Sequence, residues 1–281
     1  MNELFDLKQK IAIVTGGNGG IGNGIAQGFA SLGADVAIVA RNSRKTEAAA
    51  NQIQEAFGVR CLGLTCDVTD EKAVQQMAQS VQRELGRIDI LVNNAGINIR
   101  KLPQDYDASD WDQVLAGNLR SAFLCSKSVY PAMKAGGGGK IINIGSMTSI
   151  FGGAKLAPYG ASKGGIVQLT RSLACAWAAE NIQVNAILPG WIDTELTRQA
   201  RKDIPGLNET VVARTPTGRW GEPHELQGAA IFSGKPGVWF CHRSCAAGRW
   251  GVFQQFIVAA WNTRLERLID IGMPSMELAG G

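Results

Sequence analysis

The sequence lacks three features that would assign it to large classes of protein. No window holds the ~20 uninterrupted apolar residues that a membrane-spanning helix needs. No block of like charges is present and the net charge is only +4, which argues against a dedicated nucleic-acid surface. The N-terminal residues carry no basic segment followed by an apolar stretch, so no secretory signal is expected. We therefore expect a cytoplasmic protein that binds neither membranes nor nucleic acid.

Cysteine is also scarce, with six in 281 residues, too few for a disulfide scaffold in a chain of this size. Two of the six, Cys241 and Cys245, flank His242 but lack a second ligand pair at zinc spacing, so no metal site is predicted. Cys61 and Cys66 flank a segment that is expected to form a strand, and Cys125 and Cys175 lie in helical patterns among Ala and Leu. All four are expected to be buried thiols.

Short apolar runs alternate along the chain with segments of helical length. The unbroken runs are rich in β-branched residues and lie at 11–15, 36–40, 89–92, 141–144 and 184–188. Such runs are typical of parallel strands covered on both faces. Segments such as 70–86 and 109–134 are long enough for crossover helices. The pattern predicts an α/β fold over residues 1–232: a single Rossmann-type, doubly wound parallel sheet flanked by helices on both faces.

The first predicted strand runs into a glycine-rich stretch that contains Gly16, Asn18, Gly20, Ile21 and Gly22. Glycine permits turns that other residues resist and lets a diphosphate approach a helix N-terminus. A glycine-rich loop alone is weak evidence, because it can be merely a tight turn. Here a strand precedes it and a helical pattern follows, so the stretch predicts a dinucleotide-binding loop.

The end of the second predicted strand bears on the choice of cofactor. NAD-binding sheets place an Asp or Glu at this point for the ribose hydroxyls, whereas this chain has Ala40 followed by Arg41. The nearby acid, Asp35, precedes the strand and lies at its wrong end. Because an arginine can bind a 2′-phosphate, NADP(H) is favoured. NAD(H) is the alternative, in which Arg41 only stacks on the adenine.

Tyr159 and Lys163 are four residues apart, which places both on one face of a helix. A free phenol has a pKa near ~10, too high for ready proton exchange at neutral pH. A lysine ammonium one turn away, with the positive charge of an oxidised nicotinamide, is expected to lower the pKa of Tyr159. By itself such a pair is usually structural, so its weight depends on the other motifs.

Those other motifs occur in the order of one known family. Over residues 5–232 the sequence resembles the short-chain dehydrogenase/reductase family. Besides the glycine-rich stretch, Tyr159 and Lys163, the resemblance rests on Asp67-Val68, Asn93-Asn94-Ala95-Gly96, Asn118, Ser146, Pro189-Gly190, Ile192 and Thr194.

The resemblance implies a role for each motif. Tyr159 would be the acid/base and Ser146 would bind the substrate oxygen. Lys163 would bind the nicotinamide ribose, and Asn118 would position a water that joins Lys163 to solvent. With the residues above, the implied cofactor contacts are Gly16, Asn18, Gly20, Ile21, Gly22, Arg41, Asp67, Val68, Asn94, Ala95, Gly96, Tyr159, Lys163, Pro189, Gly190, Ile192 and Thr194.

The substrate is less strongly indicated. Residues 147–153 and 191–220 line the pocket in this family, and their Ser, Thr, Trp and Arg side chains suit a polyhydroxylated substrate. The stretch 174–194 resembles gluconate, deoxygluconate and glucose dehydrogenases, so a sugar acid or polyol is favoured. The 3-oxoacyl-carrier-protein reductases look almost the same and are the alternative enzyme. A cofactor-sensing binding protein is the non-enzymatic alternative, but such proteins usually lose a catalytic residue and all four persist here.

The resemblance stops at Phe232, and residues 233–281 diverge from the family. Three of the seven tryptophans crowd into this tail. Back-translation with permitted codons, read one base later, restores the family ending Val-Asp-Gly-Gly, so a frameshift near codons 232–234 is predicted. The family forms homotetramers partly through the seventh strand that this ending completes. The altered tail is therefore expected to compromise that tetramer, and to be disordered or to improvise a helix near 256–269.

Overall fold

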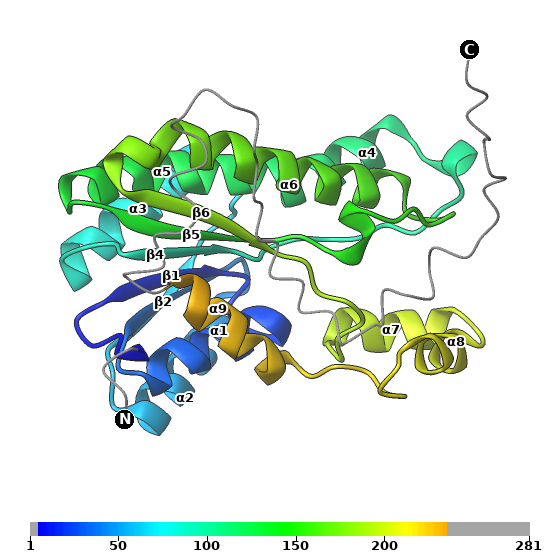
Figure 1. Cartoon of the computed structure of the whole chain (residues 1–281), viewed down its shortest axis with the longest axis horizontal. Helices are drawn as coiled ribbons and strands as arrows, with labels where there is room; N and C mark the ends of the chain where they lie inside the picture. The colour runs from blue at the N-terminus through cyan, green and yellow to red at the C-terminus, as the bar shows by residue number, and fades with distance from the viewer. Residues whose placement is uncertain (1–4, 235–281) are drawn as a thin grey trace, which may run out of the picture.

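The computed structural model describes residues 5–234, and the centre of this part is a six-stranded parallel sheet (Figure 1). The strand order β3-β2-β1-β4-β5-β6 confirms the predicted doubly wound arrangement. The strands are β1 (Ile11–Thr15), β2 (Asp35–Ala40), β3 (Cys61–Thr65), β4 (Ile90–Asn93), β5 (Gly139–Ile144) and β6 (Ile182–Ile187).

Helices cover both faces of the sheet, as predicted (Figure 1). One face carries α1 (Gly20–Ser31), α2 (Ser43–Phe57) and α9 (Gln227–Gly234). The other carries α3 (Glu71–Leu85), α4 (Ala108–Leu115), α5 (Ser121–Ala135) and α6 (Ala157–Trp177). Beyond the carboxyl end of β6 lie α7 (Glu195–Asp203) and α8 (Leu207–Arg214), which stand apart from the two layers.

Each helical layer encloses its own apolar core. Phe29 of α1 and Ile38 of β2 belong to the core under α1 and α9, and both are fully buried. Val81 of α3 and Met133 of α5 belong to the core on the opposite face. The side chains of the central strands are buried on both faces of the sheet. Those strands are therefore continuous hydrophobic runs, as the sequence indicated.

The strand register brings the carboxyl ends of β1, β2 and β4 to one edge of the sheet. Thr15 at the end of β1 lies opposite Val39 of β2, and Val14 lies opposite Val92 of β4. The loops that follow these three strands therefore emerge side by side. This is the edge at which open parallel sheets bind ligands.

One sequence-based expectation is wrong, and another is refined by the structure. Cys175 was expected to be buried but is exposed, because it lies off the stripe of α6 that packs through Ile166, Thr170 and Leu173. The predicted helix over 109–134 is present as α4 and α5, joined by a π-helical turn at Ala116–Arg120.

Several expectations concern parts of the chain that the structure does not describe. The divergent tail lies outside residues 5–234, apart from its first two residues, which end α9. The predicted frameshift and the improvised helix therefore stay predictions, as do the expectations for Cys241, His242 and Cys245. Among the described residues, no helix is long and apolar enough to cross a membrane.

Replacing Phe29 with Ala should lower the free energy of unfolding by about 3–5 kcal/mol, since it leaves a cavity between α1 and the sheet. The matched control is Phe57→Ala, which truncates a side chain that is 37% exposed at the end of α2. Urea unfolding followed by fluorescence measures both. Equal losses in the two variants would contradict the placement of Phe29 in the core.

Candidate active site

The glycine-rich loop lies between β1 and α1, as the sequence predicted. Gly16 has a φ of +64° and its N–H donates to the Val39 carbonyl at 2.7 Å, which turns the chain sharply at the end of β1. At the start of α1, Gly20 has a φ of +51°, and no side chain among the described residues caps the helix. The N-terminal N–H groups of α1 are therefore presented to a ligand, an arrangement that suits an anion.

Thr15 and Asn94 attach this loop to the end of β4. The Thr15 hydroxyl donates to the Val92 carbonyl at 3.1 Å and accepts from the N–H groups of Asn94 and Ala95 at 3.0 and 3.1 Å. The Asn94 amide donates back to the carbonyls of Thr15 and Gly16 at 3.0 and 3.2 Å. These bonds fix two of the expected cofactor-binding loops against each other.

Gly22 has a different place from the other residues of its motif. A Cβ atom there would come within 2.4 Å of both the Asn94 amide nitrogen and the Gly16 carbonyl oxygen. Gly22 therefore lets α1 pack closely against the loop, and it does not line a cavity.

Two adjoining cavities of about 580 and 630 Å³ lie along this edge of the sheet. They share Asn18, Lys45, Asn94, Gly96 and Ile97 as lining residues, so together they form one extended cleft. The cleft is lined by every expected cofactor contact except Gly22: Gly16, Asn18, Gly20, Ile21, Arg41, Asp67, Val68, Asn94, Ala95, Gly96, Tyr159, Lys163, Pro189, Gly190, Ile192 and Thr194. Its length, its uncapped helix N-terminus and its glycine turns fit a dinucleotide.

The 630 Å³ cavity has the residues expected at the adenosine end. Asp67 accepts hydrogen bonds from the N–H and hydroxyl of Thr69 at 2.9 and 2.7 Å, and these bonds, with the charge of Arg41, lower the pKa of Asp67. Asp35 lies at the opposite end of β2, where its carboxylate pairs with Arg60 at 2.6 Å. The structure therefore places Arg41 at this end of the cleft and keeps Asp35 away from it.

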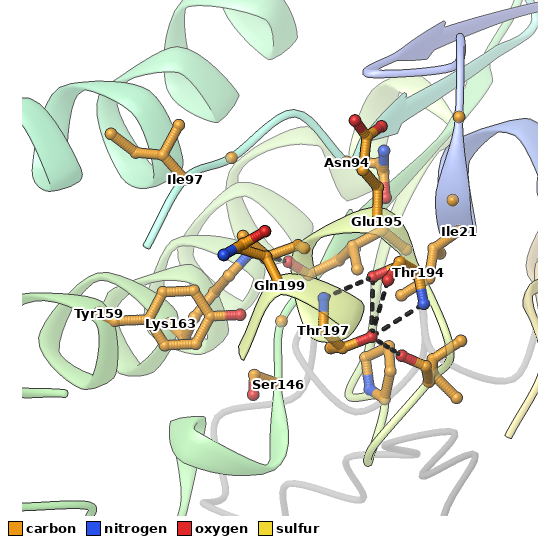
Figure 2. Close-up of a pocket in the computed structure, with 18 of the residues that line it drawn as sticks. Ile21, Asn94, Ile97, Ser146, Tyr159, Lys163, Thr194, Glu195, Thr197 and Gln199 are labelled. Atoms are coloured by element: carbon orange, nitrogen blue, oxygen red, sulfur yellow. Dashed lines mark hydrogen bonds between the residues drawn. The ribbon is translucent and has the colours of Figure 1, made fainter. Parts of the chain in front are cut away.

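The 580 Å³ cavity brings together Ser146, Tyr159 and Lys163, three of the four predicted catalytic residues. Ser146 follows β5, whereas Tyr159 and Lys163 project from α6. Figure 2 shows these three on one side of the pocket, with Ile21, Thr194 and Glu195 on the other. The Lys163 ammonium donates to the Ile144 carbonyl at 2.7 Å and lies 5.7 Å from the centre of the Tyr159 ring.

Burial has the largest effect on the pKa values of Tyr159 and Lys163. It lowers the pKa of Lys163 to about 8 and raises the pKa of Tyr159. A hydrogen bond with Ser146 and the positive charge of Arg100 act in the opposite direction on the pKa of Tyr159 without reversing the shift. The expectation that Lys163 lowers the Tyr159 pKa is therefore wrong for the protein alone. Desolvation was not visible from the spacing of the two residues.

Asn118 lies behind the cavity, in the π-helical turn between α4 and α5. Its amide donates to the Ile97 carbonyl and the Ser162 hydroxyl, both at 3.0 Å, and its oxygen accepts from the Ile97 N–H at 2.7 Å. Ser162 in turn donates to the Tyr159 carbonyl at 2.7 Å. Asn118 thus links the loop after β4 to the helix that carries Tyr159. Its expected contact with a water stays a prediction.

The far wall of the pocket is held by hydrogen bonds at the start of α7. Thr194 caps this helix, and the Thr197 hydroxyl donates to the Ile192 carbonyl at 2.6 Å (Figure 2). Ile192 also forms a bridge with Gly221, which ties this wall to the segment after α8. Contacts within 189–221 thus hold the wall together, and Ile192 also attaches it to the core between α1 and the sheet.

Three charged residues near the cleft were not singled out from the sequence, although Glu195 lies within the segment 191–220 that was expected to line the pocket. Arg100 acts on Tyr159 from the loop after β4, and Lys45 and Glu195 line the cleft from α2 and α7. No short motif marks any of them. Their placement depends on segments far apart in the chain, so only the folded structure reveals it.

The sequence profile of the short chain dehydrogenases matches residues 10–205. The chain belongs to the short chain dehydrogenase family. It is 42% identical over 229 residues to the 2-dehydro-3-deoxy-D-gluconate 5-dehydrogenase of Dickeya dadantii, covering 81% of this chain and 89% of that protein. It is 37% identical over 230 residues to the gluconate 5-dehydrogenase of Gluconobacter oxydans, covering 82% and 89% of the two chains.

Solved structures of the family agree with the fold. The gluconate 5-dehydrogenase of Burkholderia cenocepacia, in complex with NADP and tartrate, matches with a TM-score of 0.80 and 36% identity. The match covers 85% of this chain and 92% of that one. The similarity therefore extends over nearly the whole described part of this short chain dehydrogenase.

The arrangement is suited to proton transfer beside a hydride donor. When bound, a nicotinamide cofactor supplies or accepts the hydride. In the expected reaction Tyr159 would give a proton to a carbonyl oxygen or take one from a hydroxyl, and Ser146, which hydrogen-bonds with Tyr159, would bind the same oxygen. Lys163 has a buried ammonium directed at this end of the cleft, where a ribose hydroxyl could accept from it.

Replacing Tyr159 with Phe should lower kcat by about 10²–10⁴-fold, because proton transfer loses its acid/base. Cofactor affinity should stay nearly unchanged, because only the hydroxyl is removed. Replacing Lys163 with Ala should also weaken cofactor binding, since its ammonium is expected to hold the ribose. Steady-state kinetics and NADPH fluorescence titration separate the two effects. Parental turnover in the Phe variant would remove Tyr159 from the reaction.

Proposed function

We propose that this protein is an NADP(H)-dependent oxidoreductase that interconverts a hydroxyl and a ketone on a sugar acid. The observation that carries the substrate class is the positive charge of Arg100, which acts to lower the pKa of the Tyr159 phenol. A guanidinium binds a carboxylate through two parallel hydrogen bonds, which would orient an acid against the reacting group. The acyl part of a 3-oxoacyl thioester is uncharged and offers no such partner.

The relatives support the same substrate class. The proteins named above as gluconate or deoxygluconate 5-dehydrogenases are 36–42% identical to this chain. A 3-oxoacyl-carrier-protein reductase from Agrobacterium tumefaciens, solved with NADP bound, is 31% identical. The Burkholderia cenocepacia relative holds tartrate, a hydroxy acid with two carboxylates. These identities favour the sugar acid over the acyl-carrier-protein alternative.

NADP(H) is the proposed cofactor. Arg41 lines the cleft at the carboxyl end of β2, whereas Asp35 is held by Arg60 at the other end of the strand. The position that would carry an acid for NAD is therefore occupied by Ala40, and a cation, Arg41, follows it. The non-enzymatic alternative, a cofactor-sensing binding protein, is disfavoured because Ser146, Tyr159 and Lys163 line one cavity.

Assembly and location are further parts of the proposal. We propose a homotetramer of the family type, supported by apolar side chains exposed on α4 and α5: Trp111 is 44% and Phe123 43% exposed. The effect of the divergent tail on this assembly, and the cytoplasmic location, stay predictions from the sequence.

Replacing Arg41 with Ala should lower kcat/KM for NADP(H) while leaving that for NAD(H) nearly unchanged. Loss of a charge-assisted contact with the 2′-phosphate should cost about 1.5–3 kcal/mol, roughly a 10- to 150-fold change. The measurement is kcat/KM for each cofactor in the parent and the variant. A parent that prefers NAD(H), or a variant with unaltered NADP(H) efficiency, would show that Arg41 does not bind the phosphate.

Replacing Arg100 with Met should have two effects in a panel of gluconates, neutral aldoses, polyols and 3-oxoacyl thioesters. First, kcat/KM for acids should fall more than for neutral sugars, because the carboxylate loses its partner. Second, the rise of sugar-acid oxidation with pH should shift to higher pH. Arg100 lowers the pKa of Tyr159, so its removal raises that pKa and more alkali is needed to form the phenolate.

The control for this experiment is Arg83→Met, which removes an exposed guanidinium from α3 and should change neither property. A thioester as the best substrate of the parent would overturn the proposed substrate class. Equal losses for acids and neutral sugars in the Arg100 variant would mean that Arg100 does not bind the carboxylate.

A further inference from the structure

An ion pair spans the cleft outside the catalytic residues. The ammonium of Lys45 lies 2.6 Å from Oε2 of Glu195, although the two residues are 150 positions apart in the sequence. Lys45 belongs to the first turn of α2, and Glu195 is the first residue of α7. The pair therefore connects the Arg41 end of the cleft to the helix that forms the far wall of the pocket.

This pair lies directly beside the diphosphate-binding loop. A Cβ atom on Gly19 would be 3.5 Å from the Lys45 ammonium, and one on Gly20 would be 3.2 Å from the Thr194 side chain. Lys45 lines both cavities of the cleft, and Glu195 lines the cavity that contains Tyr159. A dinucleotide that follows this cleft must bring its phosphates close to both side chains.

The two charges have opposite effects on such a ligand. Lys45 attracts a phosphate, whereas the Glu195 carboxylate repels it and also neutralises Lys45 in the free protein. Glu195 is ionised at neutral pH, since the hydrogen bond and charge of Lys45 lower the pKa of its carboxyl. Both side chains are solvent-accessible, 48% and 85% exposed, so either can change partner without unfolding its helix.

We propose that Lys45 is a phosphate-binding residue of this cleft and that Glu195 competes for it. Binding of the cofactor exchanges the Lys45–Glu195 pair for an ion pair between Lys45 and a cofactor phosphate, and this exchange releases the start of α7. The inference rests on the proposed use of a phosphorylated dinucleotide. It adds that Glu195 holds the affinity for that dinucleotide below the value that the cations alone would give.

The exchange also couples the two ends of the cleft. Glu195 follows Thr194, which caps α7 and lines the pocket opposite Tyr159. Freeing Glu195 therefore alters the restraint on the wall that a substrate would contact. The cofactor is thereby expected to loosen α7 from α2 before the substrate binds.

The test measures dissociation constants of NADP⁺ and NAD⁺ by titration calorimetry on the full chain and its variants. Glu195→Gln keeps the size of the side chain and removes its charge, so it should tighten NADP⁺ binding by roughly two- to tenfold. Lys45→Gln should weaken binding roughly tenfold or more. In the double variant the effect of Glu195→Gln should be much smaller, because no lysine remains to be released.

The two cofactors distinguish which phosphate Lys45 binds. An effect of Lys45→Gln on NADP⁺ alone assigns Lys45 to the 2′-phosphate, and an equal effect on both assigns it to the diphosphate. The matched control is Glu71→Gln, which breaks a comparable surface pair with Lys127 at 3.0 Å between α3 and α5. This control should leave both dissociation constants unchanged.

Hydrogen exchange of the free protein supplies a readout that needs no cofactor. Glu195→Gln should accelerate exchange of the amides of α7 and leave those of the central strands unchanged. If the parent binds the cofactors but Glu195→Gln leaves the affinity unchanged or weakens it, the competition is disproved. If the parent binds neither cofactor, the proposed function fails, and the exchange data alone then decide whether the pair restrains α7.

Discussion

The site depends on the attachment of the glycine-rich loop to the end of β4. Thr15 is buried, and its hydroxyl serves three partners at once: one carbonyl and the N–H groups of Asn94 and Ala95. Asn94 returns two hydrogen bonds to the loop, and Gly22 allows α1 to approach both. Because these groups are partly or fully removed from water, loss of one partner would leave others unsatisfied. The network thereby fixes the glycine-rich loop relative to the loop after β4, which lines the same cleft.

At the reaction centre, burial rather than pairing sets the protonation states. Lys163 is 5% exposed, and this burial lowers its pKa to about 8 although its ammonium donates to a main-chain carbonyl. Burial likewise favours the neutral phenol of Tyr159, which suits the donation of a proton to a ketone. Formation of the phenolate needs positive charge nearby, and Arg100 provides part of it. The positive ring of an oxidised nicotinamide would act in the same direction, so cofactor binding would favour alcohol oxidation.

The sequence predicted those parts of the structure that local patterns determine. Apolar runs marked five of the six strands, and the third lies between Cys61 and Cys66, where a strand was expected. Motif residues around the cleft were found because most of them lie just after a strand or in the first two turns of a helix. Lys45 and Arg100 were missed, and Glu195 was not singled out within 191–220, because their effects arise from contacts or charges between distant segments. The Tyr159 pKa was misjudged for the same reason, since desolvation depends on packing that helix spacing does not report.

Charge is distributed along the cleft in a way that matches two separate anions. Arg41 and Lys45 lie toward the end formed by β2 and α2, and Arg100 acts at the end that holds Tyr159. A sugar acid and a phosphorylated dinucleotide would each meet a cation without sharing it. Glu195 lines the cavity that holds Tyr159 and is paired with Lys45, so its negative charge limits the attraction of either anion to the wrong end. On this argument the acid of the pair contributes to specificity as well as to affinity, because it separates two basic regions that would otherwise compete for the same ligand.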